Sequence, residues 1–151
     1  MPDLATRAKE LVNQLEERGT LAIRTIAMPA DTNPSGDIFG GWLLAQMDLA
    51  AGNLAGQIAR GRCATVAIDG IQFVRPVHVG DEVSIYAKLE KIGRSSITMN
   101  IQAWARPRNE ASAENVINSK FVFVAIDEEG KPRPLPENAE TNMVYRRLPK
   151  D

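Results

Sequence analysis

The feature that most constrains this chain is a long segment, residues 38–59, that contains no Lys, Arg or Glu. Ala and Gly recur throughout it, so a helix built from these residues has no polar face. A helix that is apolar on nearly all sides is usually buried. Its small side chains would let neighbouring backbone approach closely. The segment therefore predicts a central helix wrapped by a curved sheet rather than a helix lying on a surface.

The length of this segment alone would allow it to cross a membrane, since about 20 apolar residues suffice. It is interrupted by four polar residues, Gln46, Asp48, Asn53 and Gln57. An Asp in the middle of a spanning helix costs about 2.5–3.5 kcal/mol on insertion scales. We therefore expect the core helix of a soluble domain and no membrane insertion.

The residues that lead into the helix carry the first candidate site. Turn formers at positions 34–36 precede Asp37, and Gly40 and Gly41 follow it. Amides in the first turn of a helix form a partly positive surface, and here no side chain covers them. Such a surface accepts an oxygen that carries negative charge and could serve as half of an oxyanion hole. Taken alone, an Asp in this turn is more often a helix cap, and that alternative stays open for Asp37.

Asp48 is the second candidate carboxylate. It lies eleven positions after Asp37, about three helical turns, so both fall on roughly one helix face. An ionised carboxylate in an apolar helix is costly unless it is hydrogen-bonded, paired or protonated, and such groups concentrate at functional sites. The structural alternative is a buried carboxylate bonded to backbone amides or to a partner chain.

The rest of the chain reads as one more helix and five strands. The charged helix spans residues 4–18 and ends at Gly19. The expected strands are residues 21–28, 63–74, 82–92, 96–105 and 115–126. In the second of these the apolar alternation changes parity at Asp69-Gly70, which indicates a bulge. Everything after Asp127 is charged and rich in proline, so we expect a poorly ordered or loosely docked tail.

These elements predict a single α+β domain in which antiparallel strands cover the long helix. The strands at 82–92 and 96–105 alternate apolar and polar residues, so each has one face open to water. One five-stranded sheet cannot enclose the helix completely. We therefore expect a partner subunit, and a dimer at least.

Composition excludes several classes of function. The net charge is −1 and no cluster of Lys and Arg follows a face, which argues against nucleic acid as a partner. Cys63 is the only cysteine and His78 the only histidine. A metal site built on those ligands is improbable, and we expect Cys63 to be a packing residue. A lone cysteine, with no secretory signal visible, fits a cytoplasmic location.

Five motifs occur in an order that resembles a known family. They are Asn33-Pro34-Ser35-Gly36-Asp37-Ile38-Phe39-Gly40-Gly41-Trp42, Gln46-Met47-Asp48, Thr65-Val66-Ala67-Ile68-Asp69, Val79-Gly80-Asp81 and Gly93-Arg94-Ser95-Ser96. Together they resemble the hotdog-fold acyl-CoA thioesterases of the bacterial YciA type. The Gly-Asp-Ile-Phe-Gly-Gly block is the specific part of the likeness. The resemblance as a whole divides the chain into an N-terminal helix (1–19), a hotdog thioesterase domain (20–136) and a C-terminal tail (137–151).

The resemblance implies an enzyme that hydrolyses acyl-CoA thioesters to a free carboxylic acid and CoA without a cofactor. In hotdog proteins a five- to six-stranded antiparallel sheet wraps a long helix, and active sites form at the interface of two protomers. Members of the YciA type commonly assemble as trimers of dimers, so a hexamer is implied here. The resemblance gives Asp37 the role of catalytic carboxylate and implicates Asp48, acting across the interface.

The mechanism that follows is a hypothesis. The amides of Gly40 and Gly41 would stabilise the oxyanion, and Asp37 would activate a water or attack directly to give a mixed anhydride. The sequence does not separate these two routes.

Two further sets of residues would bind the substrate. The candidates for the phosphates of CoA are Arg94, Ser95 and Ser96, with Arg75 as a lesser one. The alternative is that residues 93–96 form an ordinary solvated hairpin. The candidates for the acyl pocket are Phe39, Trp42 and Met47, which could equally be core residues.

Two other functions are known alternatives for a chain of this fold class. A non-catalytic acyl-CoA sensor would keep the pocket without turnover, but the two carboxylates argue against it. A dehydratase would need a histidine near the start of the helix, and the sequence places none there.

Overall fold

The computed structural model describes residues 2–142, apart from the side chains of residues 14–16. Residues 143–151 of the expected tail lie outside the described part. The elements are α1 (Leu4–Arg18), β1 (Thr20–Ile26), η1 (Pro29–Asp31), α2 (Gly40–Ala59), β2 (Cys63–Phe73), β3 (Glu82–Ile92), β4 (Ser96–Arg106), β5 (Glu114–Ala125) and η2 (Ala139–Asn142). Both helices and all five strands predicted from the sequence are confirmed, with ends that differ by at most two residues.

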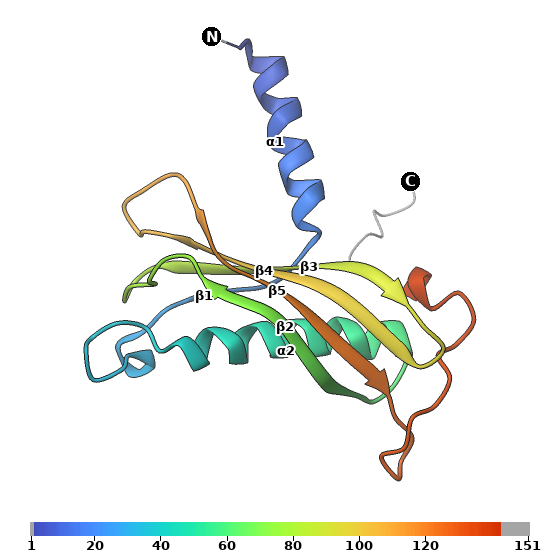
Figure 1. Cartoon of the computed structure of the whole chain (residues 1–151). Coiled ribbons are helices and arrows are strands. Elements are labelled where there is room, and N and C mark those ends of the chain that lie inside the picture. The colour runs from blue at the N-terminus through green and yellow to red at the C-terminus, as the bar shows by residue number, and fades with distance from the viewer. Residues whose placement is uncertain (1, 143–151) are drawn as a thin grey trace.

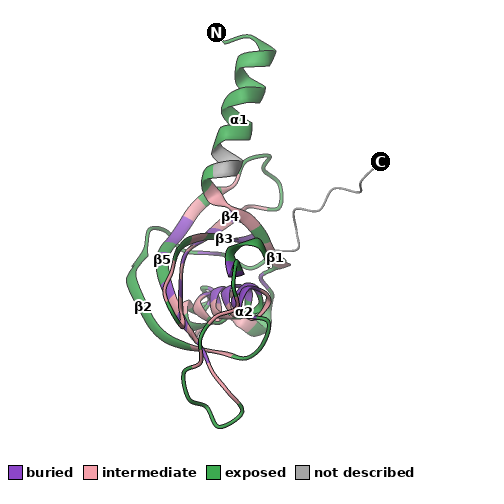
Figure 2. Cartoon of the chain, turned by 90° about the vertical axis from the view of Figure 1, so that its right-hand side faces the viewer, coloured by how far each residue is buried: buried purple, intermediate pink, exposed green. Residues whose placement is uncertain are grey.

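The five strands form one antiparallel sheet that curves around α2 (Figures 1 and 2). Their order is β1-β3-β4-β5-β2, so β1 and β2 are the two edges. Every neighbouring pair is antiparallel. The α+β class and the long helix wrapped by a sheet are therefore confirmed.

The core lies between α2 and the inner face of the sheet. In β4 the side chains alternate strictly, and Ile97, Met99 and Ile101 are fully buried on the inner face. The small residues of α2 let the sheet approach the helix, and Ala50, Ala51 and Ala55 are also fully buried. This packing accounts for the missing polar face in the sequence of the helix.

One side of α2 remains uncovered in the single chain. Leu49 is 61% exposed, and Ala45 and Asn53 are exposed on the same helix. An apolar helix with an open side agrees with the expectation that one sheet cannot enclose it. Among the described residues, no helix combines the length and the apolar character needed to cross a bilayer.

The irregularity predicted in β2 is present. The register with β5 shifts between Asp69 and Gln72, and Gly70 lies between them with a φ of +70°. Glycine tolerates this left-handed conformation because it has no Cβ. The hydroxyl of Ser119 on β5 donates to the carbonyl of Asp69 at 2.7 Å, which holds the bulge.

Helix α1 stands away from the sheet (Figure 1). Leu4, Leu11 and Val12 on it are more than half exposed. Its last residue, Arg18, places its guanidinium 3.5 Å from the ring centre of Trp104 and 5.6 Å from that of Tyr86. These cation–π contacts attach the base of α1 to the sheet face opposite α2.

The segment after Asp127 differs from our expectation of loose docking. Ile126 pairs with Pro132, and the amide of Leu135 donates to the carbonyl of Arg94 at 2.8 Å. Ala139 in η2 is only 2% exposed. Charge and proline content suggested a loose tail, but the composition of a segment carries no information about its contacts with distant strands. As far as residue 142, the segment packs on the domain.

Candidate active site

Asp37 lies in the loop that leads into α2, and it does not cap the helix. The N-cap position is held by Phe39, which makes no side-chain cap bond, and α2 begins at Gly40. The capping alternative for Asp37 is therefore wrong. Its side chain is 53% exposed, so the carboxylate is accessible to a small molecule such as water.

The backbone around Asp37 is held by Asn33. The Asn33 side-chain oxygen accepts the amide hydrogens of Ser35 at 2.9 Å and of Asp37 at 3.2 Å. The Asn33 amide in turn donates to the Asp37 carbonyl at 2.7 Å. The turn formers at positions 33–36 thus fix the peptide that carries the carboxylate.

A histidine also lies at this entrance, although the sequence suggested none. The Nδ1 atom of His78, in the turn before β3, is 3.9 Å from Oδ1 of Asp37. The two residues are far apart along the chain. They meet because the amide of Ile38 donates to the carbonyl of Val77 at 3.1 Å. The expectation that no histidine lies near the helix start is therefore wrong, because His78 is distant along the chain but lies beside the helix entrance in the folded structure.

Two aromatic rings cover the first turn of α2. A Cβ added to Gly41 would lie 2.6 Å from the ring of Phe39, and one added to Gly40 would lie 3.1 Å from the ring of Phe73. Both positions therefore leave no comfortable room for a side chain. The amides of these two glycines have no intrahelical acceptor because of their place in the first turn. Phe73 at the end of β2 is a neighbour of the site that sequence reasoning missed.

Asp48 is held by a side chain of β2. The hydroxyl of Thr65 donates to Oδ1 of Asp48 at 2.7 Å. This bond supplies a partner for the half-buried carboxylate. The structural alternative had expected backbone amides or a partner chain as that partner. The helical rise puts Asp48 about 12 Å along α2 from Gly40. Within one chain, the structure therefore separates Asp48 from the first-turn amides beside Asp37.

The Gly93–Ser96 turn borders a small cavity of about 180 Å³. Its lining residues are Arg94, Ser95, Pro132, Arg133 and Pro134. Ser96 is not among them, and its carbonyl instead accepts the amide hydrogen of Gly93 at 2.8 Å. The cavity thus brings Arg94 and Ser95 together with Arg133, a cation that sequence reasoning assigned to the tail.

Arg75 lies in a different place. It forms an ion pair with Glu114 and borders a second cavity of about 310 Å³ together with His78. The structure therefore groups Arg75 with the entrance to α2 and not with Arg94.

The three candidates for the acyl pocket differ in burial. Met47 is fully buried in the core, Trp42 is half-buried and Phe39 is 55% exposed. Met47 therefore packs as a core residue in the single chain, while the ring of Phe39 is open to a ligand.

The remaining reactive groups offer no site of their own. Burial raises the pKa of the Cys63 thiol, and its Sγ donates to the carbonyl of Ala55 at 3.5 Å. Within residues 2–142, the His, Cys, Asp and Glu side chains form no group of three or more that could hold a metal ion.

Comparison with known proteins places this geometry in a family. Residues 35–112 match the model of the thioesterase superfamily. The acyl-CoA thioester hydrolase YciA of Salmonella typhimurium is 48% identical over 125 residues, which cover 79% of this chain and 92% of that protein. The YciA protein of Escherichia coli is 46% identical over the same shares of both chains.

Solved structures agree with the sequence relatives. The hexameric thioesterase y2039 from Yersinia pestis superposes with a TM-score of 0.74 at 50% identity, and the match covers 78% of this chain and 96% of that one. The Asp44Ala mutant of HI0827, a hexameric broad-specificity acyl-coenzyme A thioesterase, superposes with a TM-score of 0.78 at 40% identity, covering 83% and 92%. The chain therefore belongs to the thioesterase superfamily, as a hotdog-fold member of the YciA type.

Proposed function

We propose that this chain hydrolyses acyl-CoA thioesters to a free carboxylic acid and CoA, with Asp37 as the catalytic carboxylate. The observation that carries the proposal is the place of Asp37. It is fixed by Asn33, half-exposed, and separated by only two residues from the first turn of α2, whose Gly40 and Gly41 amides have no intrahelical acceptor. Relatives that are named acyl-CoA thioester hydrolases support the substrate class.

In the proposed mechanism the thioester carbonyl oxygen lies against the amides of Gly40 and Gly41. Asp37 takes a proton from a water, whose oxygen adds to the carbonyl carbon. The tetrahedral intermediate then collapses, the carbon–sulfur bond breaks, and the CoA thiolate leaves and takes up a proton. Loss of one oxyanion donor typically costs about 3–4 kcal/mol. The exposure of Asp37 leaves room for water, which favours this route over direct attack by the carboxylate.

Asp48 is proposed to serve the site of the neighbouring protomer. Its distance along α2 separates it from the first-turn amides of its own chain, whereas the open side of the helix faces outward. Thr65 would orient its carboxylate by the 2.7 Å hydrogen bond.

The two ends of the substrate are proposed to bind in different places. The phosphates of CoA would meet Arg94, Ser95 and Ser96, because guanidinium and hydroxyl donors suit phosphate. Arg133 borders the same cavity and would add positive charge. The acyl chain would follow the exposed rings of Phe39 and Phe73, next to Trp42.

We further propose a dimer that assembles into a hexamer. The solved relatives y2039 from Yersinia pestis and HI0827 are described as hexameric. The proposed hydrolysis needs only water as co-substrate. The single cysteine, Cys63, fits a reducing compartment such as the cytoplasm.

Release of free thiol from a panel of acyl-CoAs tests the proposed function. The wild type should release thiol, and Asp37→Ala should lower kcat by about 10²–10⁴-fold, the usual contribution of a general base. Asp3→Ala is a matched control, because Asp3 caps the distant helix α1 through the amide of Thr6. Tight binding of acyl-CoA by the wild type without thiol release would indicate a sensor instead. Unchanged kcat in Asp37→Ala would remove Asp37 from the mechanism.

A further inference from the structure

His78 takes no part in the proposed hydrolysis, yet its ring faces the carboxylate of Asp37. The distance from Nδ1 to Oδ1 is 3.9 Å, which is longer than a hydrogen bond but within reach of one after a small side-chain rotation. Both side chains are more than half exposed in the single chain, so each has room for that rotation.

The packing of the core sets the separation of this pair. The hydrogen bond from the Ile38 amide to the Val77 carbonyl joins the residue after Asp37 to the residue before His78. Ile38 is 6% exposed and Val77 is 1% exposed. Since two buried neighbours are tied together, the carboxylate and the imidazole are held opposite each other by the fold.

The backbone of His78 is fixed a second time by Asp81. The His78 amide donates to Oδ2 of Asp81 at 3.0 Å, and the Asp81 amide donates back to the carbonyl of His78 at 3.1 Å. Asp81 is itself buried, and its carbonyl accepts the amide hydrogen of Ala27 at 3.0 Å. Oδ2 of Asp81 is therefore engaged in building the turn, whereas Oδ1 of Asp37 faces the imidazole.

The groups around the imidazole are mainly acidic. His78 borders the cavity of about 310 Å³ at this end of the sheet. The charged residues that border the same cavity are Arg75, Asp81, Glu110 and Glu114. Arg75 is paired with Glu114. The imidazole therefore lies among carboxylates that can accept its N–H, and the one that faces it at 3.9 Å is Asp37.

We propose that His78 is a positioning residue for Asp37. Its Nδ1–H donates to Oδ1 of Asp37 and turns the other carboxylate oxygen toward the water that attacks the thioester. This inference rests on the proposed role of Asp37.

The test compares kcat and KM for the wild type, His78→Ala and His78→Asn. His78→Ala should lose about 10-fold to 100-fold in kcat with KM little changed, because the carboxylate is no longer oriented. His78→Asn keeps a donor near the position of Nδ1 and should recover most of kcat.

Val79→Ala is the matched control, since Val79 is the exposed neighbour of His78 and should keep the kcat and KM of the wild type. A His78→Ala variant with the kcat of the wild type would overturn the inference, as would a His78→Asn variant with no recovery of kcat. So would a loss in Val79→Ala equal to that in His78→Ala, because the effect would then be structural. Asp37→Asn is measured in parallel. If it is active, the assignment of Asp37 fails and this inference with it; if it is inactive while His78→Ala is normal, only this inference fails.

Discussion

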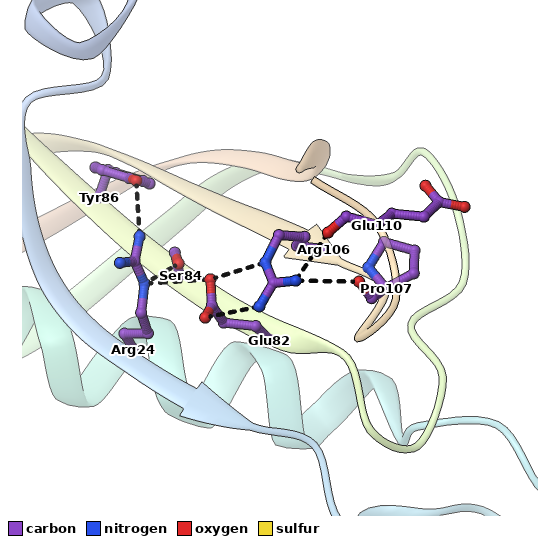
Figure 3. A network of polar contacts seen from close by, with 7 residues as sticks. All are labelled: Arg24, Glu82, Ser84, Tyr86, Arg106, Pro107 and Glu110. Atoms are coloured by element: carbon purple, nitrogen blue, oxygen red, sulfur yellow. Dashed lines mark hydrogen bonds and ion pairs between the residues drawn. The ribbon is translucent and has the colours of Figure 1, made fainter. Parts of the chain in front are cut away.

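At the scale of single residues, Glu82 shows how one carboxylate can organise a surface (Figure 3). Its two oxygens lie 3.5 and 3.2 Å from Nε and Nη2 of Arg106, and Oε1 is 3.5 Å from Nε of Arg24. Arg106 also donates to the carbonyl of Glu110 at 2.8 Å and so holds the β4–β5 loop. The hydrogen bonds from Arg106 lower the pKa of Glu82 below its usual value. The carboxylate therefore links β1, β3 and β4 on the sheet face opposite the core.

The lowered pKa of Glu82 predicts a loss of stability in acid. A carboxylate whose pKa is lower in the folded than in the unfolded state stabilises the fold above its unfolded pKa, about 4.3, and this contribution is lost as the pH falls through the folded value. Glu82→Gln should lower the free energy of unfolding by about 1 kcal/mol at pH 7, since the pair is partly exposed, and should show a flatter decline between pH 5 and pH 3. Urea unfolding at several pH values measures this. Glu129→Gln, which alters an exposed ion pair with Lys131, is the control. Equal slopes in wild type and Glu82→Gln would contradict the prediction.

At the scale of elements, the two ends of α2 are finished by different parts of the chain. At the N-terminal end, the first turn begins with glycines whose amides have no intrahelical acceptor. At the C-terminal end, the carbonyls accept hydrogen bonds from the segment after β5. Arg133 Nη2 donates to the carbonyl of Ala59 at 2.9 Å, and Asn142 Nδ2 donates to that of Ile58 at 3.0 Å. These bonds satisfy carbonyls that have no intrahelical partner, and the charge of Arg133 suits the negative end of the helix.

Asn142→Ala should therefore destabilise the fold without altering catalysis. It removes the donor to Ile58 and the acceptor for Nη2 of Arg60, and we expect a loss of about 1 kcal/mol in the free energy of unfolding. The value of kcat should stay at that of the wild type, because the substitution lies at the end of α2 opposite Asp37. Denaturant unfolding and thiol-release assays measure both properties. Glu140→Ala, an exposed residue of the same short helix, is the control, and an equal loss in both variants would count against the cap.

At the scale of the whole molecule, two unpartnered surfaces lie side by side. Strand β2 is an edge of the sheet, and Val66, Ile71 and Phe73 on it are 56%, 38% and 51% exposed. Helix α2, which contacts β2, exposes Leu49. An apolar edge strand with unpaired backbone groups favours pairing with another strand. Joining two β2 edges would extend the sheet and bring two sets of site residues together.

Val66→Lys should weaken this assembly, because a charge on an edge strand opposes strand pairing. We expect sedimentation velocity to show a shift from the hexamer toward smaller species, with loss of thiol release, since the proposed site needs both protomers. Leu4→Lys replaces an even more exposed apolar residue on α1 and should leave the assembly unchanged. A Val66→Lys variant that stays fully assembled would place the interface elsewhere.

The sequence by itself determined the elements and their class. The absence of Lys, Arg and Glu over residues 38–59 predicted α2, alternation predicted β3 and β4, and the change of parity at Asp69-Gly70 predicted the irregularity of β2. Each of these signals arises between residues that are close along the chain, so a linear pattern records it. The Gly-Asp-Ile-Phe-Gly-Gly block predicted the family in the same way, because its motif is contiguous.

Only the tertiary structure decided which distant side chains meet. It brought His78 to Asp37, Thr65 to Asp48 and the ring of Phe73 to Gly40, and it docked the segment around Ala139 on the domain. Periodicity and turn chemistry do not specify such contacts, since they depend on strand register and on the packing of α2 against the sheet. The motifs indicated where the chemistry lies, whereas the neighbours of each reactive group follow from the way the sheet wraps the helix.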